Sequence, residues 1–275
     1  MDSHGNYILE IGSSRTLFAA HIDTADRQMT KVRRVVKGDY VSTDGATILG
    51  ADNRSGIVIL LHLIRNKVPG KYVFFVGEES GRIGSTFAAK DGIADGMDRV
   101  VCWDRYGETS IITHQMGERS CSDDFTNALV GEYKRFGVVL APDNGGAYTD
   151  SYSFIDEVPE CTNISIGYYN QHTTSETQDV RFLMEMAEAS VLVDWEGLPV
   201  SRDPFSVEQR PPWKYADSYW GPKSTYEGYS NVDDLVQEAQ WGTLRKDAVE
   251  DFLWENPKES AELLYDLLMG VNVHG

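Results

Sequence analysis

The sequence predicts an α/β protein in which helices cover both faces of a central, mixed and mostly parallel sheet. Two observations favour this three-layer α/β/α class. Up to about residue 200, short apolar runs typical of strands alternate with longer segments of helical periodicity. Several of the strand-like runs also end in a histidine or a carboxylate, and α/β proteins place their chemistry at the carboxyl ends of parallel strands. We therefore expect one catalytic domain over residues 1–200.

Four apolar runs are the predicted strands, and three longer segments are the predicted helices. The strands are Leu17–His21, Tyr72–Val76, Arg99–Trp103 and Asn163–Gly167. The helices are Ser55–Arg65, Ser122–Phe136 and Val180–Asp194. The pair Asp44-Gly45 predicts a hairpin turn, because Asp-Gly readily adopts the positive φ angles of tight hairpins. A hairpin among crossover units makes the sheet mixed.

The composition changes after residue 200. Residues 210–229 are rich in aromatic residues, Pro, Gly and Ser, which indicates an ordered linker, and three short helices are expected after it. The last helix has Asn256 as N-cap, Pro257 at its first position and Gly270 after its end. We expect residues 201–275 to form an acidic, helical C-terminal extension. A cap on the catalytic domain, a self-association contact, a docking module for another protein and a flap over the cleft all remain open roles.

Composition excludes several classes of function. The formal net charge of -18 argues against a nucleic-acid partner, since a phosphate backbone recruits Lys and Arg. No run of 18 or more apolar residues occurs, and the N-terminus lacks the basic start and apolar core of a signal peptide, so we expect no membrane segment and a cytoplasmic location. The widely spaced cysteines suit a reducing compartment, and they are Cys102, Cys121 and Cys161.

Five segments at the ends of apolar runs carry residues that can bind a metal. They are Ala20-His21-Ile22-Asp23, Gly50-Ala51-Asp52-Asn53, Gly77-Glu78-Glu79-Ser80-Gly81, Cys102-Trp103-Asp104 and Gln171-His172-Thr173. Each segment alone has an ordinary interpretation: a hydrogen-bonded histidine, a turn, a solvated acidic loop or, for Asp52, a helix N-cap. Five such ends in one chain are much harder to explain by chance.

Together the segments match what two adjacent divalent ions require. Ions of the zinc type take imidazole nitrogen and carboxylate oxygen, and a pair of them needs one carboxylate that bridges both. A further carboxylate must take the proton from the activated water. The pair Glu78-Glu79 supplies one ligand and one base. Asp23 shares a strand face with His21, so it is placed to orient that ring.

These motifs, in this order, resemble the co-catalytic zinc exopeptidase superfamily, and the resemblance covers about Tyr7 to Trp195. The superfamily includes aminopeptidases, carboxypeptidases and N-acyl-amino-acid deacylases. Residues 148–154 and the Val158-Pro159 pair are similar to the single-domain aminopeptidase branch. The resemblance implies that Glu78 is the general base and that Asp52 bridges the metals. The remaining ligands would be Glu79 and His172 on one ion, and His21 and Asp104 on the other.

The chain departs from many relatives in two ways. Too little sequence separates Asp104 from His172 for the inserted lid or dimerisation domain of the deacylase and dipeptidase relatives. The HxD motif also comes almost at once, where many relatives carry a helical segment first. The missing insertion favours a single catalytic domain with an open cleft. The short start leaves the residues that line the substrate pocket unassigned.

The expected activity is hydrolysis of a peptide or an amino-acid amide by an aminopeptidase with two metal ions. Zinc is the favoured metal, with manganese or cobalt as alternatives. Asp150 or Glu160 is a candidate for recognising the free amine of the substrate, and Tyr168 or Tyr169 for stabilising the tetrahedral intermediate. A deacylase of N-acyl amino acids and a non-catalytic binding protein that kept the fold remain the alternatives.

Overall fold

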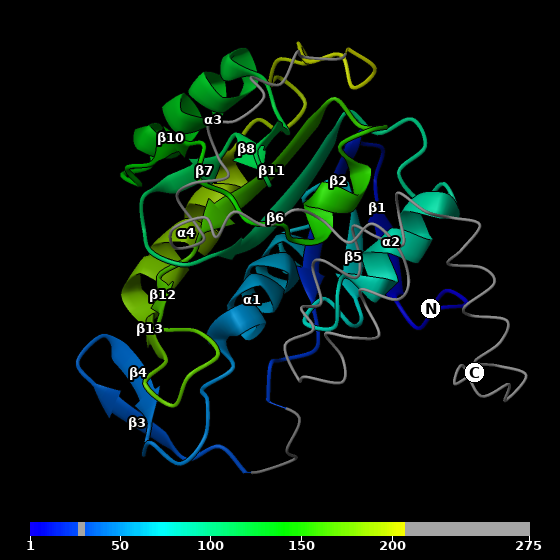
Figure 1. The fold of residues 1–275 in the computed structure, drawn as a ribbon. Coiled ribbons are helices and arrows are strands. Elements are labelled where there is room, and N and C mark those ends of the chain that lie inside the picture. Colours follow the sequence, from blue (N-terminus) through cyan, green and yellow to red (C-terminus); the bar gives the residue numbers. More distant parts are fainter. Residues whose placement is uncertain (27–30, 207–275) are drawn as a thin grey trace, which may run out of the picture. The chain divides into compact units, whose positions relative to one another are not determined.

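The computed structural model describes residues 1–26 and 31–206, and its centre is a seven-stranded sheet (Figure 1). The strand order is β1-β5-β2-β6-β11-β7-β10. The neighbouring pairs β5-β2, β2-β6, β6-β11 and β7-β10 are parallel, whereas β1-β5 and β11-β7 are antiparallel. The predicted mixed, mostly parallel sheet is therefore confirmed. The bounds are β1 Tyr7–Ile11, β2 Thr16–His21, β5 Gly70–Phe75, β6 Arg99–Arg105, β7 Ser110–Ile112, β10 Ala141–Asp143 and β11 Glu160–Ser165.

Helices cover both faces of this sheet, which confirms the three-layer class. In β2 the alternate residues Phe18 and Ala20 pack in a core with α1, α3 and α4. Leu17 and Ala19 point to the opposite face and pack in a second core with α2 and the 3-10 helix η1. The helix bounds are α1 Ala51–Arg65, α2 Ile83–Lys90, α3 Asp123–Arg135, η1 Asp150–Phe154 and α4 Val180–Leu192.

Two small sheets accompany the central one. The larger has the order β12-β13-β4-β3, and its hairpin β3-β4 extends away from the central sheet (Figure 1). Its strands are β3 Arg34–Lys37, β4 Tyr40–Thr43, β12 Tyr168–Tyr169 and β13 Thr177–Asp179. The other pairs β8 His114–Gln115 with β9 Glu118–Arg119.

The position predicted for the hairpin turn is wrong. Lys37 pairs with Tyr40, so the turn is Gly38-Asp39, and Gly38 has the positive φ of 61° that the turn requires. The pair Asp44-Gly45 follows β4 instead. The predicted linker and helices of the C-terminal extension from residue 207 onward lie outside the described residues. Within residues 1–26 and 31–206, no helix has the length and apolar character needed to span a membrane.

Candidate metal centre

The carboxyl ends of β2, β5 and β6 lie side by side, because these strands are parallel neighbours in the sheet. His21 is the last residue of the fully buried strand β2. Asp104 lies one residue before the end of β6. The pair Glu78-Glu79 follows β5 after the turn residue Gly77, whose φ is 68°. The sheet therefore delivers one imidazole and three carboxyl groups to the same edge.

Asp52 lies between the two histidines. It belongs to the first turn of α1 but has non-helical backbone angles, φ -78° and ψ 105°. Its Oδ1 atom is 3.0 Å from Nε2 of His21, and its Oδ2 atom is 3.1 Å from Nε2 of His172. His172 comes from the loop between β12 and β13 and is half-exposed. Each oxygen of one carboxylate thus faces a different imidazole.

Two further carboxylates complete the surroundings of these histidines. Oδ1 of Asp104 is 3.4 Å from Nε2 of His21. Oε1 of Glu79 is 3.0 Å from Nε2 of His172. Two groups of possible ligands result, each with its atoms within 4.8 Å of one another, and both contain Asp52: His21, Asp52 and Asp104 in one, and Asp52, Glu79 and His172 in the other.

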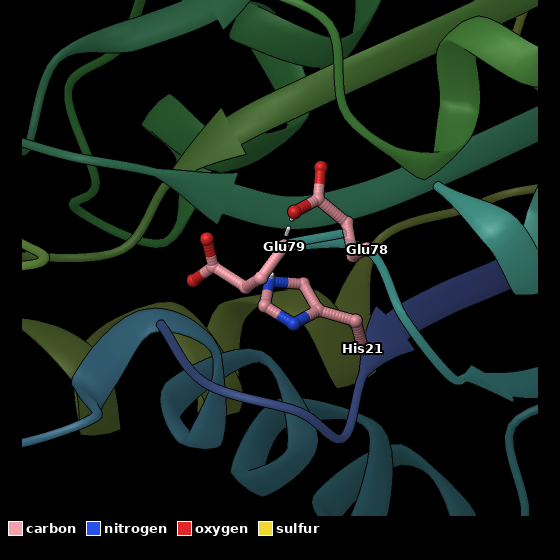
Figure 2. Close-up of side chains that lie close together, drawn as sticks. All are labelled: His21, Glu78 and Glu79. Atoms are coloured by element: carbon pink, nitrogen blue, oxygen red, sulfur yellow. Dashed lines mark ion pairs between the residues drawn. The ribbon is translucent and has the colours of Figure 1, made fainter. Parts of the chain in front are cut away.

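Glu78 lies beside this pair of groups. Its Oε2 atom is 4.0 Å from Nε2 of His21, and Figure 2 shows its carboxyl group above the histidine ring, with the carboxyl group of Glu79 to the left. Glu78 is 9% exposed, and burial together with the charge of Asp104 raises its pKa to about 9. Glu78 also falls in a third possible ligand group, with His21 and Glu79.

Asp23 supports the acidic pair through the backbone. Its Oδ1 and Oδ2 atoms accept hydrogen bonds from the backbone N–H groups of Glu78 and Glu79, at 3.1 Å each. Its Oδ1 atom is also 3.5 Å from Nδ1 of His21. One carboxylate therefore fixes the loop that carries Glu78 and Glu79 and lies against the far side of the His21 ring.

Asp104 is held by two residues that the sequence did not reveal, Asn163 and Thr149, and by the sequence candidate Tyr168. The side chain of Asn163 in β11 accepts from the N–H of Asp104 at 2.8 Å and donates to its carbonyl at 3.0 Å. Thr149 donates to the carboxylate at 2.6 Å. The hydroxyl of Tyr168, which is buried, lies 3.4 Å from the same carboxylate. A polar asparagine within a fully buried strand was the one available signal.

Glu176 was also missed. Its carboxylate accepts from the N–H of Gly50 at 2.6 Å and from the N–H of Asp52 at 3.1 Å. It therefore takes the place of a side-chain N-cap on α1, whose N-cap residue Gly50 has none. The interpretation of Asp52 as that N-cap is wrong, because its carboxylate faces the histidines instead.

The two residues considered for amine recognition lie in different places. Asp150 begins η1 next to Thr149 and is 1% exposed, and burial raises its pKa to about 6. Glu160 is the first residue of β11, so it lies at the amino ends of the parallel strands, whereas the ligands lie at their carboxyl ends. Its carboxylate accepts from Ser122 and from the N–H groups of Ser201 and Arg202. Glu160 is thus a structural residue. Tyr169, a candidate for stabilising the tetrahedral intermediate, donates its hydroxyl to the carboxylate of Glu108 at 2.8 Å.

The pKa values of both histidines and of Asp104 are raised at the site. Hydrogen bonds to Asp52 and Glu79 raise the pKa of His172 to about 10. Burial alone would lower the pKa of His21, but Asp104 outweighs it and holds that pKa well above its usual range. Burial and then the charge of Asp52 raise the pKa of Asp104 to about 7. These shifts have a common cause, because four carboxyl groups share the site with only two imidazoles.

This donor set fits divalent cations. Imidazole nitrogens and carboxylate oxygens are the ligands of zinc and similar ions, and the excess of buried acidic groups needs positive charge nearby. Asp52, Glu79 and His172 would hold one ion, and Asp52, His21 and Asp104 the other.

Comparisons with known proteins agree with this fold. No protein-family profile matches the chain. Over 92 residues the chain is 38% identical to the uncharacterised protein YqjE of Bacillus subtilis, a match that spans 30% of this chain and 24% of that protein. The chain therefore matches only about a quarter of the length of this curated relative.

Several solved structures are similar over most of the chain. The aminopeptidase PepT of Bacillus cereus superposes with a TM-score of 0.60 and 17% identity, over 70% of this chain and 84% of that one. A tripeptidase of Staphylococcus aureus gives a TM-score of 0.55 with 14% identity, over 69% of this chain and 83% of that one. The TET1 peptidase of Pyrococcus horikoshii gives 0.55 with 18% identity, over 71% and 88%. The chain has the same fold as these peptidases, in agreement with the α/β fold that the resemblance in its sequence implied.

Proposed function

We propose that this chain is a metallo-aminopeptidase that binds two divalent ions through Asp52 and hydrolyses peptide or amino-acid amide bonds. In this proposal Asp52 bridges the ions, and Glu78 is the general base. The other four ligands would be His21 and Asp104 on one ion, and Glu79 and His172 on the other.

One observation carries the proposal. The two oxygens of Asp52 face Nε2 of His21 at 3.0 Å and Nε2 of His172 at 3.1 Å. A carboxylate that served only as a hydrogen-bond partner would need one histidine. A carboxylate shared between two separate ligand groups is what a pair of ions 3.5–4 Å apart requires, by the general geometry of such sites.

The chemistry divides between the ions and the side chains. When bound, the ions would polarise the scissile carbonyl and lower the pKa of water. Glu78 would accept a proton from that water and return it to the leaving amine. Asp23 would hold the backbone of Glu78 and Glu79 in place during both steps, through its hydrogen bonds at 3.1 Å. Tyr168 is buried and its hydroxyl lies 3.4 Å from the carboxylate of Asp104, which favours a role in orienting that ligand.

Peptides are the preferred substrate class because the similar solved structures are named as an aminopeptidase, a tripeptidase and a TET1 peptidase. A deacylase of N-acyl amino acids would use the same metal centre, so it remains the alternative within the fold. The convergence of Glu78 with five potential ligands favours an enzyme over a binding protein that merely kept the fold.

A substrate panel tests the proposal. The purified full-length chain, loaded with zinc, manganese or cobalt, would be offered amino-acid amides and short peptides, each with a free and with an N-acetylated amine. We expect cleavage of the free-amine compounds that a chelator abolishes and added metal restores. Cleavage of only the blocked compounds would make the chain a deacylase, and no cleavage with any of the three metals would contradict an enzyme.

We also propose that the bound metal is zinc rather than manganese or cobalt. In this proposal the chain divides into a catalytic domain over residues 1–200 and a C-terminal extension over residues 201–275. Self-association is a further part of it. The TET1 peptidase of Pyrococcus horikoshii is described as assembling into a tetrahedron or a large octahedral shell.

A further inference from the structure

We propose that Glu176 is a positioning residue that fixes Asp52 and His172 relative to each other, and that it thereby controls the affinity of one metal position more than the other. This inference rests on the proposed two-metal function. The position concerned is the one formed by Asp52, Glu79 and His172.

The first half of the link runs from Glu176 to Asp52. The carboxylate of Glu176 is 1% exposed and accepts from the N–H groups of Gly50 and Asp52, at 2.6 and 3.1 Å. These amides belong to the start of α1, where N–H groups have no partner within the helix. Because Asp52 departs from helical geometry there, its backbone needs a partner from elsewhere in the chain. Glu176 supplies it across 124 positions of sequence.

The second half of the link runs from Glu176 to His172. The N–H of Glu176 donates to the carbonyl of Thr173 at 3.1 Å, and the hydroxyl of Thr173 donates to the carbonyl of Asn170 at 2.7 Å. Asn170 and His172 have φ angles of 55° and 63°, in the left-handed region that side chains rarely adopt. Such a backbone persists only when its surroundings determine it. The buried carboxylate of Glu176 anchors this loop to α1.

The other metal position has separate supports. His21 ends a strand in the middle of the sheet, and Asp104 is fixed by two hydrogen bonds with Asn163, at 2.8 and 3.0 Å. Only Asp52 is common to both positions. Loss of the Glu176 contacts would therefore displace two ligands of one ion but only one ligand of the other.

The structure also offers a matched control. The hydroxyl of Ser55 donates to Oε1 of Gln178 at 2.5 Å, which is a buried link between α1 and β13, the strand that directly follows Glu176. Neither residue belongs to one of the groups of possible ligands. Ser55→Ala thus removes a buried hydrogen bond between the same two regions of the chain and leaves the atoms of the Glu176 contacts unchanged.

The test is a calorimetric titration of the metal-free, full-length chain with Zn2+ alone, for wild type, Glu176→Gln and Ser55→Ala. We expect two binding events in wild type and in Ser55→Ala. In Glu176→Gln we expect one event to weaken about 10- to 100-fold, the usual effect of losing a group that orients a metal ligand, and the other to change much less. The Mn2+-loaded protein gives a spectroscopic readout: the spin-coupled pair signal of wild type should give way to that of an isolated ion in Glu176→Gln at one equivalent per site.

Three results would overturn the inference: unchanged zinc affinities in Glu176→Gln, equal weakening of both events, or the same loss in Ser55→Ala. If the circular dichroism of Glu176→Gln differs from that of wild type, Glu176→Asp takes its place, because its shorter side chain keeps the charge but cannot reach both amides. Two zinc ions in wild type with no selective loss in either variant refute the inference alone. A wild-type chain that binds no zinc refutes the proposed function and the inference together.

Discussion

Asp52 is the residue on which the candidate centre depends. One group of possible ligands contains His21 and the other contains His172, and Asp52 is the residue that these two groups share. Asp52→Asn leaves one oxygen and replaces the other with an amide nitrogen, which does not ligate these ions. We expect this variant to retain at most one tightly bound ion. Elemental analysis after dialysis measures the metal content, with Asp91→Asn on the surface as control. Two ions retained by Asp52→Asn would show that the carboxylate does not bridge.

Glu78 is expected to act on the proton rather than on the metal. Glu78→Gln should keep the metal content of wild type and lower kcat by about 10²- to 10⁴-fold, the usual contribution of a general base. Glu185→Gln, on the outer surface of α4, is the matched control and should leave kcat unchanged. Near-normal turnover by Glu78→Gln would refute the assignment of the base.

The buried carboxyl group of Asp150 should make the stability of the metal-free chain depend on pH. Burial raises the pKa of its carboxyl group to about 6, against 3.8 for an ordinary aspartate, with charges of His21, Asp23 and Arg82 nearby. Between these values the folded chain holds a proton that the unfolded chain has lost, so this group makes folding less stable as the pH rises from 4 to 6. Above pH 6 the loss in the free energy of unfolding is complete, at about 3 kcal/mol for a pKa difference of roughly two units.

Asp150→Asn removes this titration. In the presence of a chelator, its free energy of unfolding should be similar to that of wild type at pH 4 and higher than that of wild type at pH 8. Urea unfolding at both pH values measures the difference. A variant that is less stable than wild type by the same amount at both pH values would show that the buried carboxyl group does not titrate as described.

At the scale of elements, Glu160 joins three segments at the edge of the sheet opposite to the metal centre. Glu160 is the first residue of β11. Its carboxylate accepts hydrogen bonds from Ser122, which caps α3, and from the backbone N–H groups of Ser201 and Arg202. Glu160→Gln turns one acceptor into a donor that faces donors. We expect a loss of about 1–3 kcal/mol in the free energy of unfolding, the usual cost of an unsatisfied buried group. Metal content should not change, and a parallel loss of metal would contradict a purely structural role.

The elements that the sequence predicted are those with strong local patterns. Four apolar runs became the parallel strands β2, β5, β6 and β11, and the three predicted helices are α1, α3 and α4. The edge strand β1 exposes most of its residues and α2 has only eight, so neither gives a clear apolar pattern. Gly38-Asp39 and Asp44-Gly45 are both favourable turn sequences, so local sequence does not tell which of them forms the hairpin. Only the pairing of Lys37 with Tyr40 decides among them.

The same distinction applies to the candidate centre. The proposed ligands could be chosen from the sequence because they follow apolar runs, and the parallel strands β5, β2 and β6 bring His21, Glu79 and Asp104 together. Asp52 in α1 and His172 in the loop after β12 join them through the tertiary fold. The residues that support them could not be chosen. Asn163 meets Asp104 across 59 positions and Glu176 meets Asp52 across 124, so their contacts exist only after the sheet has formed.

At the scale of the whole molecule, metal binding should stabilise the fold. The chain carries a formal net charge of -18, and four of its carboxyl groups converge on one site. Ions that bind only the folded state add about 2.7 kcal/mol of stability at a free concentration 100-fold above Kd. We therefore expect zinc to raise the Tm and a chelator to lower it, as followed by differential scanning calorimetry. The shift should shrink in Asp52→Asn, and a full shift in that variant would place the zinc elsewhere.

The central claim is that Asp52 joins two metal positions, and the most direct test is the number of zinc ions bound per chain. The wild-type chain would be stripped with a chelator, reloaded with zinc, passed over a desalting column and measured by elemental analysis against protein concentration. The account predicts two zinc ions per chain. One ion or none would contradict it.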